Sequence, residues 1–276
     1  MIYFGNTHAE GNKPTRHYDE MWSIMRYPTK NLKCKVVNHP ELAPSQDLFN
    51  YYQNVLKNNW NKRTFTDLYL PRFMAEHQDQ QFKDTLNYLY KVCNDKDIIL
   101  MCSCFKDELC HRSIIRGMLA GACAEFKDYN KLGAISCEYT ADLSYYTRWK
   151  NYDYYRRPAI LVAGSRNFND YNLLCNTLNS FITSPNTVII TGHARGADML
   201  AERYAQERGL ENISMPADWD RYGKSAGYRR NEEMHNRLEW FPTRQCICFW
   251  DGISKGTQHN FGLCEQYGTH LITIRF

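Results

Sequence analysis

One stretch of this chain, residues 191–198 (TGHARGAD), has residue types that suit phosphate or sugar chemistry. It follows an apolar run and precedes a helical pattern, so Gly192 and Gly196 lie in a turn between a buried strand and a helix. Such a turn directs backbone amides and the positive end of a helix dipole toward one point, which attracts anions. Arg195 adds a forked cation, and Asp198 adds a carboxylate suited to sugar hydroxyls or to acid–base chemistry. The sequence therefore predicts a nucleotide or phosphorylated-sugar site.

Two further turns lie between an expected strand and an expected helix. In the first, Gly164 allows close backbone approach, and Ser165 and Arg166 can donate to an anion. The second has the same small residues, free amides and hydroxyls: Asp251, Gly252, Ser254, Gly256 and Thr257. Each of the three turns, taken alone, is also compatible with an ordinary connection between a strand and a capped helix. In the loop 191–198, Asp198 would then only stabilise the helix through its dipole. Three such turns in one sheet favour a composite ligand site.

The polar segment 216–231 is too long for a minimal connection, and its aromatic residues and glycines favour a binding loop. Trp219 could stack on a base, while Lys224 and Arg230 could reach a phosphate. Asn231 completes the set of candidate ligand-binding residues in this segment. The alternative is that Trp219 packs under the loop and that the charged side chains are solvated.

A turn in the first half, residues 102–113 (CSCFKDELCHRS), is rich in cysteine and also precedes a helical pattern. Cysteine at a helix N-terminus beside histidine and arginine has a lowered thiol pKa, so Cys110 and His111 are candidates for nucleophilic or redox chemistry. The same residues could ligate zinc, but Cys-x-Cys-x5-Cys-His lacks two well-spaced pairs, and we expect no metal. A structural turn that caps a helix or holds a phosphate is the third alternative. That anion site would consist of Cys104, Cys110, Arg112 and Ser113.

The second half alternates between strands and helices, which predicts a Rossmann-like parallel sheet covered by helices on both faces. Ligands on such sheets bind beyond the carboxyl ends of the strands, where all three glycine turns lie. The expected strands cover 159–163, 188–190, 213–215, 246–249 and 271–274, and the expected helices cover 171–181, 199–208 and 257–266.

The first half is less regular, and we expect a second, smaller α/β domain there. A stretch rich in tyrosine and charge, 145–158, ends at a proline and separates the two halves. The predicted domains are therefore 1–150 and 158–276. Expected strands in the first half cover 2–4, 35–37 and 97–102, and expected helices cover 48–56, 82–92 and 113–120.

Composition supports folded domains, because 43% of the 276 residues are hydrophobic and 14% are aromatic. No segment approaches the roughly 20 apolar residues that span a bilayer, and the first residues lack the design of a signal peptide. The cysteines number 11, an odd count that suits a reduced compartment better than a disulfide scaffold. We expect a cytoplasmic protein with no membrane partner. A net charge of only +4 without a basic block disfavours nucleic acid as a partner.

Four motifs of the second half carry a resemblance to a known family. They are GSRxFxD at 164–170, TGxARGAD at 191–198, PADW with GKxAG and RN at 216–231, and FWDGxSxGT at 249–257. Their order and spacing resemble the YspA/YpsA-related branch of the SLOG superfamily, which is named for Smf/DprA and the LOG phosphoribohydrolases. The resemblance covers about 158–276. It implies a Rossmann-like fold that binds nucleotides or nucleotide-derived ligands, a homo-oligomer, most simply a dimer, and a role in bacterial or phage immune signalling.

The LOG enzymes use a catalytic glutamate in a PGGxGTxxE motif. This chain has Gly256 and Thr257 of that motif, but Asn260 occupies the glutamate position. An amide cannot take a proton as a carboxylate does, which counts against hydrolysis by the usual residue.

The first half, over about 1–140, resembles domain-of-unknown-function family 488. The resemblance rests on the strand followed by Cys-x-Cys-(x5)-Cys-His-Arg-Ser, with the segment 69–73 (YLPRF) as a weaker match. It implies candidate positions and no particular reaction. These positions are Cys104, Cys110, His111 and Arg112.

We expect the protein to bind a nucleotide-derived small molecule, such as an NAD-derived or cyclic-nucleotide signal, because phosphate-type turns occur without an obvious catalytic pair. The alternative is a hydrolase that cleaves an N-glycosidic or phosphoester bond of such a ligand. Its acid–base candidates would be Asp198, Glu202 and Asp251, with Arg195 and Lys224 stabilising charge. Nucleic-acid binding of the DprA kind is a third, less favoured hypothesis.

Overall fold

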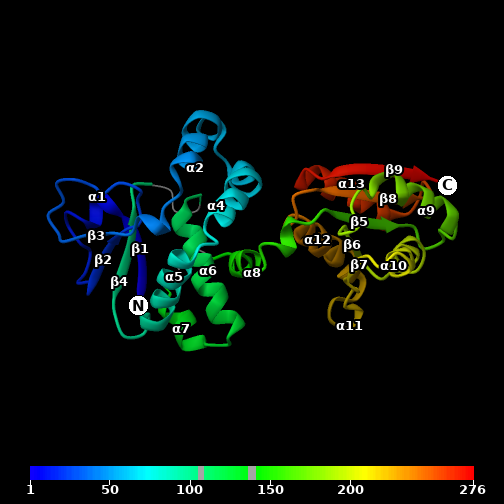
Figure 1. Ribbon diagram of the computed structural model, residues 1–276. Coiled ribbons are helices and arrows are strands. Elements are labelled where there is room, and N and C mark those ends of the chain that lie inside the picture. Colours follow the sequence, from blue (N-terminus) through cyan, green and yellow to red (C-terminus); the bar gives the residue numbers. More distant parts are fainter. Residues whose placement is uncertain (105–108, 136–140) are drawn as a thin grey trace. The chain divides into compact units, whose positions relative to one another are not determined.

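The structure, a computed structural model, describes residues 1–104, 109–135 and 141–276. The chain divides into two compact units, Met1–Tyr152 and Asp153–Phe276 (Figure 1). Each unit has its own sheet and its own apolar core. In the described ranges, no helix is both long enough and apolar enough to cross a membrane.

The C-terminal unit contains a parallel five-stranded sheet in the order β7-β6-β5-β8-β9. The central strand is β5 (Ala159–Gly164), which pairs with β6 on one side and β8 on the other. The strands that follow β5 are added first on one side, as β6 and β7, and then on the other side, as β8 and β9. The strand order therefore reverses beside β5, and in open α/β sheets ligands bind at such a switch point. The predicted Rossmann-like parallel sheet is confirmed. The other strands are β6 (Val188–Thr191), β7 (Glu211–Ser214), β8 (Gln245–Trp250) and β9 (His270–Arg275).

Helices cover both faces of this sheet, because alternate residues of a strand point to opposite faces. Ile160 and Val162 pack in the core beneath α9 and α10, whereas Leu161 and Ala163 pack in the core beneath α12 and α13. The helices are α9 (Tyr171–Phe181), α10 (Ala197–Glu207), α11 (Trp219–Tyr222), α12 (Ala226–Leu238) and α13 (Lys255–Tyr267), with 3-10 turns at Tyr154–Arg156 and Gly223–Ser225.

Local signals fix the ends of these helices. The Asp170 side chain caps α9 by accepting a hydrogen bond from the backbone amide of Leu173 at 2.8 Å. Gly268 ends α13 in the left-handed region, with φ of 64°, which glycine adopts without steric cost.

The segment 216–231 is largely helical, so the prediction of a binding loop is wrong for its second part. A short helix, α11, and a 3-10 turn lead directly into α12, which begins at Ala226. Helical spacing buries Met234 and Leu238 against the sheet, and the polar side chains that suggest a loop lie mostly on the other side of α12.

The N-terminal unit contains a parallel four-stranded sheet in the order β1-β4-β2-β3. Its central strand β4 (Ile98–Cys102) is buried along its whole length and pairs with β1 and β2. The predicted second α/β domain is confirmed, and its sheet is the smaller one, although this unit is the longer of the two. The strand β2 is absent from the sequence-based expectation.

The remaining elements of the N-terminal unit are mostly short. The strands are β1 (Ile2–Asn6), β2 (Glu20–Ser23) and β3 (Val37–Asn38). The helices are α1 (Thr7–Glu10), α2 (Gln46–Tyr51), α3 (Lys62–Thr64), α4 (Leu70–Glu76), α5 (Gln80–Val92), α6 (His111–Glu125), α7 (Tyr129–Ala134) and α8 (Ser144–Lys150). Other helical turns span Pro40–Leu42, Tyr52–Leu56, Lys57–Asn59 and Phe65–Tyr69.

Candidate functional site

A cleft of about 470 Å³ lies at the carboxyl ends of β5 and β8. A second cavity of about 640 Å³ shares part of its wall, including Arg166, Arg195, Trp219 and Arg230. Both volumes are in the range of small-molecule sites. Residues of the cleft wall come from the end of β5, from the turns after β5, β6 and β8, from the 3-10 turn at Gly223–Ser225, and from α10, α11, α12 and α13: Ala163, Gly164, Arg166, Asn167, Ala194, Arg195, Asp198, Trp219, Lys224, Gly227, Tyr228, Arg230, Asn231, Asp251, Ile253, Ser254, Gly256, Thr257 and Asn260.

The loop 191–198 is folded around one buried carboxylate, that of Asp198. Its Oδ2 accepts a hydrogen bond from the backbone amide of Gly192 at 2.9 Å, and the side chain is only 2% exposed. Burial raises the pKa of Asp198 to about 6, although Arg230 and the amides of Gly192 and Ala194 oppose this shift. The carboxylate thus already uses backbone donors that the sequence assigned to an external anion. A ligand anion must therefore rely more on side chains at this turn.

Gly192 and Gly196 are both required by close contacts. A Cβ atom at Gly192 would overlap the guanidinium of Arg230, which donates to the Gly192 carbonyl. Gly196 has φ of +91°, and a Cβ atom there would lie 2.3 Å from the carbonyl oxygen of Ser165. The loop can therefore approach both α12 and the turn after β5 only because it has no side chains at these two positions.

The turn after β5 is tied to the turn after β8. Gly164 lies so close to β8 and α10 that a Cβ atom would be 2.6 Å from the Phe249 carbonyl oxygen. Ser165 is buried, and its hydroxyl accepts a hydrogen bond from the backbone amide of Asp251 at 3.2 Å. Ser165 therefore joins two walls of the cleft and is not itself part of the cleft surface.

The turn after β8 is organised by Asp251. Its Oδ1 accepts hydrogen bonds from the backbone amides of Ile253 at 3.1 Å and Ser254 at 2.8 Å. Although partial desolvation raises the pKa of Asp251, these bonds and the Ser165 hydroxyl lower it below its usual value. Asp251 is accordingly an ionised turn residue, and Ser254 directly precedes the first turn of α13.

Two adjacent residues of α12 connect the loop 191–198 to the turn after β8. Arg230 donates through Nε to the Asn231 side-chain oxygen at 3.0 Å, and its Nη1 lies 3.6 Å from Asp198 Oδ2. Asn231, which is buried, donates through Nδ2 to the Gly256 carbonyl at 3.1 Å. Asn260 donates to the same carbonyl at 3.3 Å, so the residue at the LOG glutamate position helps to shape the turn.

The mouth of the cleft presents cations beside an aromatic ring. Trp219 is 50% exposed, and the guanidinium carbon of Arg166 lies 5.6 Å from the centre of its ring. Arg195, which is exposed, donates through Nε to the Arg166 carbonyl at 3.3 Å, and Lys224 is also exposed. This arrangement can hold an anion and a planar ring next to each other.

The third acid–base candidate, Glu202, belongs to a different network. Its carboxylate accepts hydrogen bonds from Thr191 at 2.7 Å and Ser214 at 3.0 Å and pairs with His193 at 2.9 Å. Although burial raises the pKa of Glu202, these three partners lower it overall. Asp198, Glu202 and Asp251 are therefore all engaged with groups of the protein itself.

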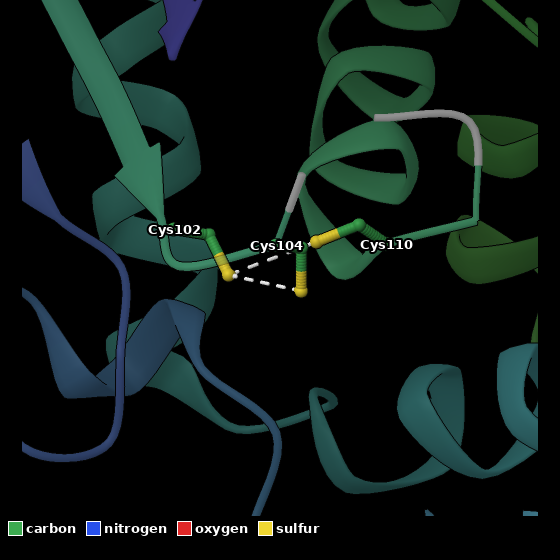
Figure 2. A group of neighbouring side chains, drawn as sticks. All are labelled: Cys102, Cys104 and Cys110. Atoms are coloured by element: carbon green, nitrogen blue, oxygen red, sulfur yellow. Dashed lines mark hydrogen bonds between the residues drawn. The ribbon is translucent and has the colours of Figure 1, made fainter. Parts of the chain in front are cut away.

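In the N-terminal unit, three cysteines of the turn after β4 converge at its carboxyl end (Figure 2). The Cys102 Sγ lies 3.5 Å from that of Cys104 and 3.7 Å from that of Cys110. Its hydrogen bonds with Cys104 and Cys110 lower the pKa of the Cys102 thiol, whereas hydrogen bonds with Cys102 and Cys110 raise that of Cys104. Residues 105–108 of the predicted turn lie outside the described residues.

The polar side chains that follow Cys110 form hydrogen bonds with backbone carbonyl groups. Arg112 is buried and donates to the carbonyl groups of Gly5 and Cys104. The Ser113 hydroxyl donates to the Cys110 carbonyl at 2.7 Å. His111 Nδ1 lies 3.6 Å from Cys110 Sγ; although burial lowers the His111 pKa, the neighbouring thiolates raise it well above its usual value. These contacts hold the turn in place, and the anion site remains a prediction.

Comparison with known proteins places both units in families. Residues 11–122 match the model of the Active DUF488-N3 subclade, and residues 158–222 match that of the YspA, cpYpsA-related SLOG family. The Gene 61 protein of Mycobacterium phage D29 is 32% identical over 122 residues, which are 42% of this chain and 94% of that protein. This chain belongs to the DUF488-N3 and SLOG families. The X-ray structure of DNA processing protein A (DprA) from Streptococcus pneumoniae shares 18% identity at a TM-score of 0.35, over 45% of this chain and about half (52%) of that one.

The structure brings most of the predicted SLOG-domain residues to one cleft, and Gly192 lines the adjoining cavity. Ser165, Gly196 and Gly252 do not line either of these two cavities. The wall also contains residues that were not among the predicted ones: Ala163, Asn167, Ala194, Gly227, Tyr228 and Ile253. All of them lie inside the SLOG motifs or next to them, which is the signal that could have found them.

Proposed function

We propose that the SLOG domain binds a nucleotide-derived small molecule in the cleft at the carboxyl ends of β5 and β8. The main support for this proposal is the composition of the cleft wall. Arg166, Arg195, Lys224 and Arg230 face one space together with Trp219. Guanidinium groups suit phosphate geometry, and an exposed indole offers a face on which a base can stack.

The charge balance of the wall supports a ligand with phosphate groups. Of the four cations, Arg230 is already paired with Asp198, whereas Arg166, Arg195 and Lys224 are exposed. Asp251 is the other carboxylate of the wall, and its Oδ1 accepts two backbone amides. The exposed cations therefore give the cleft a positive surplus that an anionic ligand would neutralise.

Binding without turnover fits the state of the carboxylates. A general base needs a carboxylate within hydrogen-bond reach of the substrate, whereas all three candidates accept hydrogen bonds from the protein. Asn260, at the position of the LOG glutamate, has an amide and binds the Gly256 carbonyl.

Hydrolysis of an N-glycosidic or phosphoester bond is the second candidate, and one observation favours it. Asp198 lines the cleft, and its pKa is about 6. A general acid or base works best when its pKa is near the working pH, and this value is closer to neutral pH than the usual pKa of an aspartate. Catalysis by Asp198 would require the carboxylate to leave the Gly192 amide or to share it with the substrate.

Native mass spectrometry of freshly purified protein tests the proposal, because a co-purified ligand is identified by its mass. The same spectrum reports whether the protein is the homodimer that we expect. Incubation with ADP, NAD and cyclic dinucleotides, read by chromatography, separates binding from turnover. A retained and unchanged compound supports the proposal. Product formation that Asp198→Asn abolishes would instead establish the hydrolase, and a protein that neither retains nor converts any of these compounds would contradict both.

A further inference from the structure

The thiol cluster of the DUF488-N3 domain has the geometry of a metal site. The sulfurs of Cys102, Cys104 and Cys110 all lie within 4.8 Å of one another, and two of the separations are 3.5 and 3.7 Å (Figure 2). Two sulfurs bound to one tetrahedral zinc ion at 2.3 Å are separated by about 3.8 Å. All three cysteines are free. The sulfurs therefore need to move little to close around one ion.

We propose that Cys102, Cys104 and Cys110 bind one Zn²⁺ ion through their thiolates and leave a fourth position open to water or substrate. A set of three soft sulfur donors selects zinc over magnesium or calcium, which prefer oxygen. Three protein ligands with one open position are typical of catalytic zinc sites, whereas structural sites have four. This site belongs to the N-terminal unit, and the proposal does not depend on the function proposed for the SLOG domain.

Two of the three ligands are held rigidly by the fold. Cys102 is the last residue of β4, the strand that pairs with both β1 and β2, and Cys110 directly precedes α6. Both are buried. Secondary structure on either side of the turn thus places these two sulfurs before any ion arrives, which reduces the entropic cost of binding.

The third ligand supplies the entry path. Cys104 is exposed, and two hydrogen bonds hold the backbone that leads to it. Arg112 donates to its carbonyl at 2.8 Å, and the Asn6 side chain donates to the carbonyl of Ser103 at 3.1 Å. Of the three cysteines, Cys104 is therefore the one whose side chain an ion can reach from solvent.

Neighbouring groups complete the surroundings that such a site needs. Three thiolates and one Zn²⁺ carry a net charge of −1, and the buried guanidinium of Arg112 lies next to the cluster. His111 lies beside Cys110, with Nδ1 3.6 Å from Cys110 Sγ and Nε2 2.8 Å from the Ile24 carbonyl oxygen. The carbonyl can only accept, so Nε2 carries a proton and the ring orientation is fixed. We assign His111 as a positioning residue for Cys110.

A second group, His235, Cys246 and Cys264 in the SLOG domain, provides an internal control. Its ligand atoms also lie within 4.8 Å of one another, but all three residues are buried between the sheet and α12 and α13. Since none of them is exposed, an ion has no comparable entry path. A metal measurement on the full chain must therefore distinguish the two groups.

The test measures zinc in the full-length protein by native mass spectrometry and elemental analysis. We expect about one zinc per chain, and after chelation one Co²⁺ with the sulfur-to-cobalt absorption of a tetrahedral thiolate site. Cys104→Ser changes an exposed side chain and should weaken metal binding at least about a hundredfold while the circular dichroism is unchanged. Cys102→Ser and Cys110→Ser should lose the metal as well.

Matched controls are Cys34→Ser, at a partly exposed cysteine of the same domain, and Cys264→Ser in the buried group, both of which should retain one zinc. His111→Gln should shift the cobalt absorption spectrum, but the intensity of the sulfur-to-cobalt absorption should still correspond to three thiolate ligands. The proposal is overturned by a wild-type protein that takes up neither zinc nor cobalt, by loss of metal in Cys264→Ser alone, or by purified protein that holds copper in place of zinc.

Discussion

Nη1 of Arg230 lies 3.6 Å from Oδ2 of Asp198, and the same nitrogen donates to the carbonyl of Gly192, 38 residues earlier in the chain. Both side chains of the ion pair are nearly buried, with 11% and 2% exposed. The pair joins α12 to the loop 191–198, so Arg230, which lines the cleft, is also part of the scaffold. Buried ion pairs are sensitive to the loss of one partner, because the other charge is left without compensation.

Arg230→Met should therefore destabilise the protein by about 3–5 kcal/mol at pH 8. The effect should be smaller at pH 5, because loss of the cation raises the Asp198 pKa further and a protonated carboxyl no longer carries a buried charge. Urea denaturation at the two pH values measures both effects. Arg229→Met is the matched control: Arg229 is the exposed neighbour that lies over the Tyr222 ring, and its loss should change the free energy of unfolding by less than about 1 kcal/mol. Equal effects of the two substitutions would contradict the role assigned to the ion pair.

Asp198 should give the stability of the protein an unusual pH dependence. Its folded-state pKa of about 6 is higher than the ordinary value of 3.8, so between these values the native state holds a proton that the unfolded chain has released. This contribution to the free energy of unfolding is present at low pH and is lost as pH rises through 6, by about 3 kcal/mol at 1.36 kcal/mol per pKa unit. Asp198→Asn removes it. The free energy of unfolding of the variant minus that of the wild type should therefore increase between pH 4 and pH 7, and a difference that stays constant or falls would refute the assignment.

Gly196→Ala should destabilise the SLOG domain more than Gly209→Ala. Both glycines have a positive φ, of 91° and 64°, but only the Cβ atom at 196 meets a backbone atom, the Ser165 carbonyl oxygen at 2.3 Å. The strain common to left-handed positions costs roughly 1–2 kcal/mol, and this is all that we expect at Gly209. Thermal denaturation of the two variants isolates the steric contact. Equal melting temperatures would show that the loop can move away from the turn after β5.

Arg195→Ala should weaken the binding of ADP or NAD about tenfold or more, because a charge-assisted hydrogen bond to phosphate contributes about 1.5–3 kcal/mol. Isothermal titration calorimetry measures this change. Arg203→Ala is the control, since Arg203 lies on α10, the helix that follows the loop of Arg195, and pairs with Glu207 at 2.7 Å outside the cleft. If both variants bind as the wild type does, the phosphate is not held by Arg195. If both lose affinity equally, the effect is one of overall charge.

Much of the SLOG domain can be predicted from sequence, because buried strands such as 159–163 and 188–190 are apolar runs that end in glycine turns. The helix at Tyr171–Phe181 follows from periodicity and from the Asp170 cap. In contrast, α12 reads as a loop, since it contains a polar run at 229–233 and its apolar residues are few. The short strand β2 has no local signal either; it exists because β4 offers it a partner.

The candidate cleft could be located from its turns, but the roles of its residues could not. The spacing of Asp198 from Gly192 does not reveal that α12 supplies a guanidinium to the same carboxylate. The cysteine spacing in the DUF488-N3 domain likewise suggests no metal site, because the sulfurs meet only when β4 and α6 bring Cys102 and Cys110 together. Both are tertiary relationships between segments that local patterns treat separately.

The walls of the SLOG cleft come from the turns after β5, β6 and β8, whose contacts to one another include the Ser165–Asp251 and Asn231–Gly256 hydrogen bonds. A compound that fills the cleft touches all of these turns at once and binds the unfolded chain poorly. At a concentration of 100 times its Kd it would add about 2.7 kcal/mol to the free energy of unfolding. Cellular proteases remove mainly unfolded chains, so the lifetime of this protein would lengthen as such a compound accumulates. The amount of protein in the cell would then rise with the concentration of the compound.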